Sequence, residues 1–144
     1  MVKRGFRPRA LGEIAIRTRN MAAMMAFYGD VLGLRLLSTR NQGRIAFFRL
    51  GDGFAGHTAV LALFDEAGSE VATGTGGTVR SSLHHLALSL PRGEQDAAQA
   101  WLDDQQITYR IEEFGWIGWR GVFLHDPDGN TVELVAYDPN LLDD

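Results

Sequence analysis

The chain has 144 residues, of which 45% are hydrophobic and 22% are charged. This length suits one ordinary domain or two small fused modules, and the composition excludes a disordered or fibrous protein. Because the chain has no cysteine, it has no disulfide, thiolate metal site or cysteine nucleophile, and any bound metal takes nitrogen and oxygen ligands.

The N-terminal residues 1–10 form a basic arm. They hold 4 of the 14 lysines and arginines, so the rest of the chain carries 10 basic against 18 acidic side chains. An acidic body repels phosphate, which argues against a nucleic-acid partner. No apolar run of about 18 residues is present, so we expect no membrane partner and a cytoplasmic protein. We interpret residues 139–144 as an acidic C-terminal tail.

Two halves of the sequence resemble each other. Residues 44–53, RIAFFRLGDG, align without a gap with residues 120–129, RGVFLHDPDG, at an offset of 76. Residues 13–17, EIAIR, align with residues 85–89, HLALS, at an offset of 72. Both offsets are close to half the chain, which predicts two copies of one unit.

The first copy spans residues 11–66. Apolar and polar residues alternate over 12–18, which predicts a strand. Asn20 is then a candidate N-terminal cap for a helix that ends at Gly33. The apolar residues of this helix recur on one face. Three further strands separated by turns are expected over residues 34–38, 43–50 and 58–64.

A loop over residues 67–81 joins this copy to the second, which spans 82–138. The loop is rich in glycine, but no strand precedes it and no helix follows, so we interpret it as a linker and not as a phosphate-binding loop. The second copy repeats the order of elements, with a strand over 83–90, a helix over 94–105 and strands over 108–113, 121–125 and 131–137.

Each copy is therefore a βαβββ module. A four-stranded sheet with a helix on one face leaves its other face open, and two such sheets can curl around a shared interior. The predicted fold is α+β, with two tandem βαβββ modules forming a half-open mixed β-barrel with the helices outside. The barrel interior of this single domain, residues 11–138, is the expected pocket.

Strand alternation directs three polar side chains into that pocket. The apolar residues of the opening and closing strands take the helix side, so Glu13, His85 and Glu133 face the interior. Buried carboxylates need a compensating partner, and a divalent cation held by these three side chains would be one. Alternatively, Glu13 lies at a wet strand end and His85 is a structural histidine. Glu133 would then pair with Arg17.

The remaining histidines are interpreted as surface or hydrogen-bonding residues. By strand parity His84 points away from His85, and His125 precedes a turn. His57 is not an evident metal ligand either.

Other residues are candidates for holding a substrate. Trp116 and Trp119 could stack on an aromatic ligand at the pocket rim, although as core or dimer-interface residues they need no ligand. Three arginines either bind an anionic group or balance the two glutamates, namely Arg17, Arg44 and Arg120.

Three motifs resemble a known family. FYGDVLGL at 27–34, HLALS at 85–89 and FLHDPDGNTVEL at 123–134 are similar to the glyoxalase/bleomycin-resistance/dioxygenase proteins, the vicinal oxygen chelate superfamily. The resemblance implies the paired βαβββ fold and metal ligands on the first and last strand of each unit, here His85 and Glu133. The family usually has histidine where this chain has Glu13, and its fourth ligand position falls near Ala62, which cannot bind a metal.

The resemblance also implies a function. A divalent metal ion (Fe, Mn, Zn or Ni) would be chelated by two adjacent oxygens of a small substrate. With Glu13 or Glu133 as general base the reaction would be of lyase or isomerase type, and a ring-cleaving dioxygenase is a second possibility. A metal-free protein that sequesters an antibiotic or another small molecule is the alternative. A homodimer is expected, because the sheets leave edges that a second copy can cover.

Overall fold

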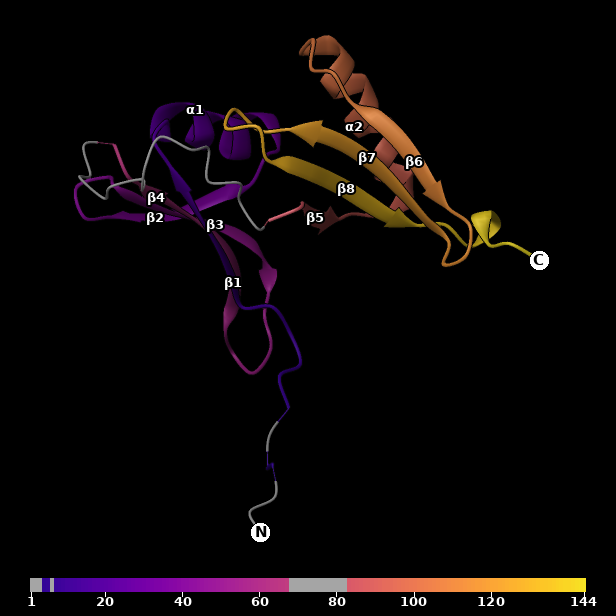
Figure 1. Ribbon diagram of the computed structural model, residues 1–144, viewed down its shortest axis with the longest axis horizontal. Coiled ribbons are helices and arrows are strands. Elements are labelled where there is room, and N and C mark those ends of the chain that lie inside the picture. Colours follow the sequence, from indigo (N-terminus) through magenta and orange to yellow (C-terminus); the bar gives the residue numbers. More distant parts are fainter. Residues whose placement is uncertain (1–3, 6, 68–82) are drawn as a thin grey trace, which may run out of the picture. The chain divides into compact units, whose positions relative to one another are not determined.

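The computed structural model describes residues 4–5, 7–67 and 83–144, drawn in colour in Figure 1. These residues belong to two compact units, Met1–Val71 and Ala72–Asp144, and each unit has one four-stranded sheet. Both units run strand, helix and three strands, which confirms the α+β class and the two tandem βαβββ modules. The closure of the two sheets into one half-open barrel stays a prediction.

The first unit has the elements β1 (Glu13–Thr18), α1 (Met21–Ala26), β2 (Arg35–Arg40), β3 (Ile45–Asp52) and β4 (Thr58–Asp65). Its strands lie in the order β1-β4-β3-β2, so the first and last strands are neighbours and pair in parallel. Met24 and Tyr28 of the helical segment are fully buried, as are Leu61 and Leu63 of β4. The helix therefore covers one face of this sheet, as the apolar periodicity predicts.

The start of the first helix differs from the prediction. Asn20 occupies the cap position but its side chain makes no capping hydrogen bond. Instead the hydroxyl Oγ1 of Thr18, a buried residue, accepts a hydrogen bond from the backbone N–H of Asn20 at 2.9 Å. The helix then widens into a π-helical turn over Phe27–Val31 and ends before Gly33, whose φ of 75° suits glycine.

The second unit has the elements β5 (Leu86–Ser89), α2 (Arg92–Asp104), β6 (Arg110–Phe114), β7 (Trp119–His125) and β8 (Thr131–Tyr137), followed by a 3-10 turn at Pro139–Leu141. Its strand order, β5-β8-β7-β6, repeats that of the first unit, with β5 and β8 parallel. Leu102 of α2, Val122 of β7 and Val132 of β8 are almost fully buried. They belong to the apolar layer between the helix and the sheet.

Turn chemistry explains why the DPDG sequence ends β7. The carboxylate of Asp126 accepts hydrogen bonds from the backbone N–H groups of Asp128 and Asn130 and from the Asn130 side-chain amide. Gly129 has a φ of 83°, a conformation that favours glycine. The chain is thereby returned from β7 into β8.

The turn that follows the strand predicted over residues 43–50 lies further along the chain than expected. β3 continues to Asp52, with a register shift between Arg49 and Gly51 where it pairs with β4. The positive φ angles are at Ala55 and Gly56. The shift adds a residue that periodicity alone does not reveal.

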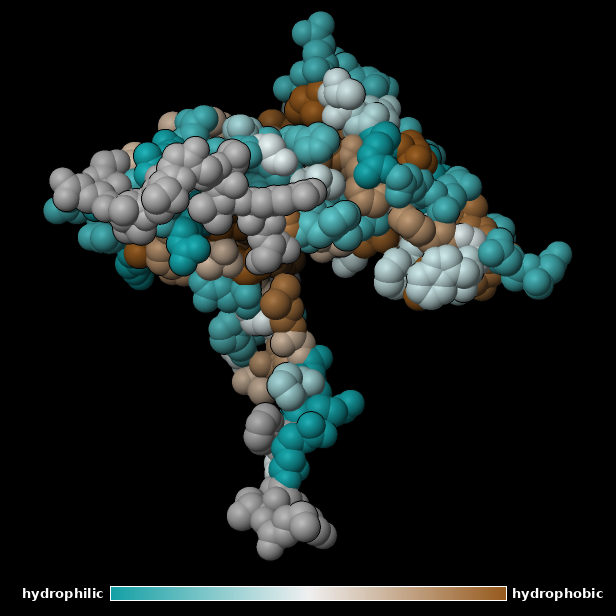
Figure 2. All heavy atoms as spheres, viewed as in Figure 1, coloured by the Kyte–Doolittle hydropathy of each residue, from teal (hydrophilic) through white to brown (hydrophobic). Residues whose placement is uncertain are grey.

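Polar residues dominate the visible surface, with smaller hydrophobic patches between them (Figure 2). No helix within the described ranges is long and apolar enough to cross a membrane. Two predicted segments lie partly outside these ranges: Met1–Lys3 and Phe6 of the basic arm, and most of the linker, including residues 72–77.

Candidate functional site

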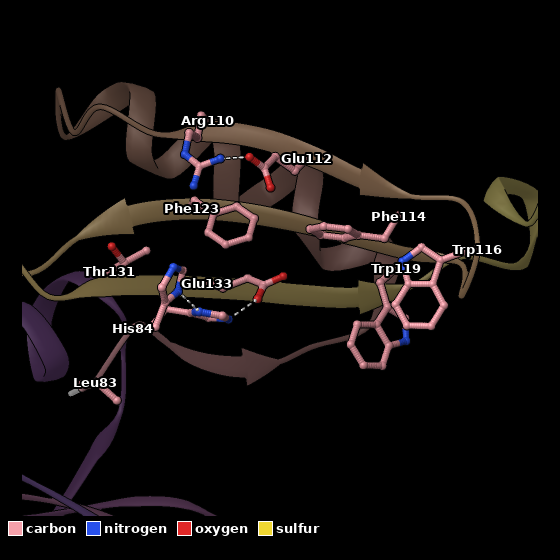
Figure 3. A pocket seen from close by; sticks show the side chains of 11 residues that line it. Leu83, His84, Arg110, Glu112, Phe114, Trp116, Trp119, Phe123, Thr131 and Glu133 are labelled. Atoms are coloured by element: carbon pink, nitrogen blue, oxygen red, sulfur yellow. Dashed lines mark hydrogen bonds and ion pairs between the residues drawn. The ribbon is translucent and has the colours of Figure 1, made fainter.

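The second unit contains a cavity of about 830 Å³ on the face of its sheet that is opposite α2 (Figure 3). Its walls come from β6, β7 and β8 and from the segment that leads into β5. The lining combines aromatic rings with a few charged or polar groups, namely Leu83, His84, His85, Arg110, Glu112, Phe114, Trp116, Trp119, Phe123, Thr131 and Glu133. This mixture is typical of small-molecule sites.

Strand register places the polar and aromatic groups in rows across the sheet. Arg110 of β6 lies opposite Phe123 of β7, which in turn lies opposite Glu133 of β8. Phe114 of β6 lies opposite Trp119 of β7. Because side chains on one face of a strand are two residues apart, both rows open into the same cavity.

His85 and Glu133 form the polar centre of the cavity. His85 Nε2 lies 3.4 Å from Glu133 Oε2, and the side chain of Glu133 is 7% exposed against 37% for His85. Burial raises the pKa of Glu133, and the nearby His85 and Arg110 oppose that rise. The carboxyl group therefore keeps a proton to higher pH than an exposed glutamate does.

Gly121 creates the room for this carboxylate. A Cβ atom at residue 121 would lie 2.5 Å from Glu133 Oε1 and 2.6 Å from Phe123 Cε2. Both distances are shorter than real Cβ contacts. A glycine within β7 is thus required by close approach and not by a turn.

The predicted direction of His84 is wrong. His84 and His85 both line the cavity, and their Nδ1 atoms lie 2.8 Å apart. One Nδ1 donates the hydrogen bond and the other accepts it. The alternation failed because β5 begins at Leu86, so the two histidines precede the strand and do not follow its parity.

Trp116 lies in the turn between β6 and β7, and Trp119 is the first residue of β7. Trp116 is 73% exposed and Trp119 is 44% exposed, so they are not core residues. Their ring centroids lie 6.5 Å apart, and with Phe114 they make the aromatic end of the cavity. A second hollow of about 610 Å³ adjoins it, with Trp119, His85 and Glu133 common to both.

Sequence reasoning missed Arg110 and Glu112. The Arg110 guanidinium lies 4.5 Å above the centroid of the Phe123 ring and forms an ion pair with Glu112 (Figure 3). The available signal was the spacing of Arg110, Glu112 and Phe114 at alternate positions of one strand, which places all three on one face.

Two other candidate residues belong to the first unit. Glu13 and Arg17 belong to the exposed face of β1 in the first unit, where Arg17 Nε pairs with Glu66 at 3.1 Å. Arg17 thus has Glu66 as its partner, and Glu133 has His85.

Two further arginines do not line the cavity. Arg120 bonds the side-chain amides of Gln95 and Gln99 on the α2 side of the sheet, so it is not a pocket residue. Arg44 donates to the backbone oxygen of Asp65.

The donor set suits part of a metal site. His85 Nε2 and Glu133 Oε2 are separated by 3.4 Å, and two ligand atoms bound at about 2.0–2.2 Å with near-tetrahedral angles lie about 3.3–3.6 Å apart. Over the described ranges, however, no group of three or more His, Asp or Glu side chains is arranged to hold a metal ion. The second unit brings together two side chains of types that bind metals, His85 and Glu133.

Comparisons with known proteins agree with the fold. The sequence matches the family model of the Glyoxalase/Bleomycin resistance protein/Dioxygenase superfamily over residues 10–134, so the chain belongs to this superfamily. No curated protein matches the chain.

Among solved structures, a lactoylglutathione lyase from Agrobacterium tumefaciens is 26% identical, with a TM-score of 0.68, 90% of this chain covered and 94% of that one. A glyoxalase/dioxygenase from Nostoc punctiforme is 24% identical, with a TM-score of 0.72 and coverages of 96% and 99%. A fosfomycin resistance protein from Listeria monocytogenes is 15% identical, with a TM-score of 0.64 and coverages of 94% and 98%. The last two likenesses show the fold alone.

Proposed function

We propose that the chain is a divalent-metal-dependent enzyme that acts on a small substrate with two adjacent oxygen atoms. The observation that carries the proposal is the pairing of His85 with the buried carboxylate of Glu133 in an aromatic cavity. Membership of a superfamily that includes lyases and dioxygenases, and whose members typically bind divalent metals, supports it.

His85, Glu133 and Glu13 are the proposed metal ligands. Glu13 is included because it aligns with His85 in the internal repeat. In both copies an alternation of large aliphatic residues with alanine follows, IAI after Glu13 and LAL after His85. Histidine nitrogen and carboxylate oxygen suit Fe, Mn, Zn or Ni. When bound, the metal would act as a Lewis acid on the substrate oxygens and stabilise negative charge that develops on them.

The residues of the chain would bind the substrate and move a proton. Trp116 and Trp119 would stack on an aromatic part of the substrate, and Arg17 would bind an anionic group of the substrate. Glu133 or Glu13, if displaced from the metal when the substrate binds, would act as general base toward a carbon acid in a lyase or isomerase reaction.

Metal binding can be tested without knowing the substrate. Untagged protein purified without chelator would be analysed for metals, and its thermal unfolding followed as Fe, Mn, Zn or Ni is added. A ligand at 100 times its dissociation constant stabilises by about 2.7 kcal/mol. We expect this stabilisation in the wild type and in His125→Ala, an exposed histidine outside the cavity lining, and its loss in His85→Ala and Glu133→Gln.

The absence of bound metal, with no change in unfolding when metals are added, would overturn the proposal. Sequestration of a planar molecule without metal is the second candidate function, favoured by the exposed Trp116 at the cavity. If no metal binds, quenching of tryptophan fluorescence by a ligand in the presence of a chelator would support sequestration.

A further inference from the structure

Arg110 is the one lysine or arginine among the described residues that line the cavity. Its guanidinium lies over the face of Phe123, 4.5 Å from the ring centroid, and both side chains face the cavity in Figure 3. Contact between a guanidinium plane and an aromatic face limits the orientations of the cation. The positive charge is thus held in a defined place in the cavity wall.

The partner that Arg110 has in the structure is easily displaced. The side chains of Arg110 and Glu112 are 58% and 43% exposed, and exposed ion pairs contribute little to stability. The pair uses Nη1 of Arg110, whereas a guanidinium carries five N–H donors. Another carboxylate can therefore bind the guanidinium by taking the place of Glu112.

The cavity has two chemically different ends. Arg110 and Phe114 are four residues apart on β6, which corresponds to about 13 Å along the strand. Arg110 and Glu133 lie toward one end, and Phe114, Trp116 and Trp119 lie at the other (Figure 3). His85 pairs with Glu133. An elongated ligand with a charged head and an aromatic tail would match both ends.

We propose that Arg110 determines specificity by binding the carboxylate of a ligand whose aromatic ring lies against Trp116 and Trp119. The proposal rests on the proposed function in placing the substrate in this cavity, and it names the substrate class as aromatic carboxylates. Glu112 opposes this binding, because it competes for the guanidinium and repels the incoming carboxylate. A neutral aromatic compound forms no ion pair with Arg110 when it displaces Glu112. The Arg110–Glu112 pair therefore favours anionic ligands over neutral ones.

The test uses the full-length protein in a chelator, so that its outcome does not depend on metal. Binding of 4-phenylbutanoate and of its uncharged amide, 4-phenylbutanamide, would be compared by calorimetry and tryptophan fluorescence. A charge-assisted hydrogen bond contributes about 1.5–3 kcal/mol, so we expect the wild type to bind the carboxylate roughly 10-fold or more tightly than the amide. Arg110→Gln should remove this preference while leaving amide binding in place.

Glu112→Gln provides the decisive comparison. If Arg110 binds the ligand, this variant should bind the carboxylate several-fold more tightly than the wild type and the amide equally. If Arg110 and Glu112 only support each other structurally, both variants should weaken both ligands. Arg40→Gln, an exposed change of equal charge on β2 of the first unit, should leave the preference unchanged.

Equal wild-type affinity for the carboxylate and the amide would overturn the proposal, as would an unchanged preference in Arg110→Gln. If Arg110→Gln does not fold, absence of tighter carboxylate binding in Glu112→Gln is sufficient to overturn it. Carboxylate preference without any metal-induced stabilisation would refute the metal-dependent enzyme and leave the role of Arg110 standing.

Discussion

Glu133 is buried, and burial changes how readily its side chain ionises. The stability of the second unit therefore depends on pH. Burial raises its pKa above the ordinary value of 4.5, and His85 and Arg110 reduce the rise without cancelling it. The folded state then binds the proton more tightly than the unfolded state. The stabilising contribution is complete below pH 4.5 and is lost as the pH rises through the pKa of the folded state.

We therefore predict that Glu133→Gln gains stability relative to the metal-free wild type as the pH rises above 4.5. The measurement is the urea concentration at half-unfolding, determined at several pH values in a chelator. Glu94→Gln, at an exposed position of α2, should follow the wild type. A variant that becomes steadily less stable than the wild type with rising pH would show that pairing with His85 outweighs burial.

Gly121 gives a second prediction at the residue scale. In Gly121→Ala the new Cβ would overlap the Glu133 carboxylate and the Phe123 ring, so at least one of them has to move. Overpacking of this kind costs about 1–3 kcal/mol. We expect this loss in chemical denaturation, together with weaker ligand or metal binding.

Gly93→Ala is the matched control for Gly121→Ala. A Cβ at Gly93, in α2, has no atom within 4 Å. Alanine is preferred to glycine in helices by up to about 1 kcal/mol, so this variant should be as stable as the wild type or more stable. Equal effects of the two substitutions would mean that Gly121 does not hold the space beside Glu133.

Which cavity residues the sequence reveals depends on how regular their strands are. Glu133 lies within β8, which pairs with β7 without a register shift, and parity correctly directs its side chain to the cavity. His84 precedes β5, so parity has no meaning there. Arg110 and Glu112 follow parity in β6 but resemble ordinary exposed residues of an edge strand, because nothing in their spacing reveals the Phe123 ring opposite them.

At the scale of elements, Gln95 is the polar anchor between α2 and its sheet. Its side chain is fully buried, and its amide nitrogen donates to the backbone oxygens of Arg120 and Leu134 at 2.7 and 3.0 Å. Its amide oxygen accepts from Arg120 Nη1. One side chain therefore links the helix to both β7 and β8.

We predict that Gln95→Leu destabilises the protein although leucine is more hydrophobic. The substitution leaves a buried guanidinium nitrogen and two carbonyl oxygens with fewer partners, at a cost of about 1–3 kcal/mol for each group left unsatisfied. Chemical denaturation would measure the loss. Gln105→Leu, at the exposed end of the same helix, should change stability by no more than about 0.5 kcal/mol.

Local sequence patterns predict which helices and strands occur. They do not predict the irregularities within these elements or where each element ends. All eight strands and both helices occur in the predicted order, because hydrophobic periodicity and turn residues act over short segments. The register shift after Arg49 and the π-helical turn at Phe27–Val31 were not predicted. Both depend on how the segment packs against its neighbours.

At the scale of the whole molecule, each sheet ends in two edge strands, and such edges are often covered by a second chain. Superfamily members often form dimers, which supports a homodimer here. We predict that sedimentation gives twice the mass of the chain. A monomer at all measured concentrations would contradict this prediction.

The dimer also gives a test of how the proposed metal site is assembled. Glu13→Ala and Glu133→Ala would each be expected to lose metal-induced stabilisation. After the two variants are unfolded and refolded together, recovery of metal binding requires Glu13 and Glu133 from different chains. Continued absence of binding in a mixture shown to contain mixed dimers would place both ligands in one chain.

The repeated register also explains an asymmetry between the halves. Glu133 lies opposite Phe123 and beside Ala87, and in the first unit Ala62 lies opposite Phe47 and beside Ala15. The residue that aligns with Gly121 in the repeat is Ile45. The first unit therefore has neither the acidic side chain of Glu133 nor the glycine that makes room for it. We therefore expect Ala62→Glu to be tolerated better together with Ile45→Gly than alone, because the double change reproduces the pairing of an acidic side chain with a nearby glycine.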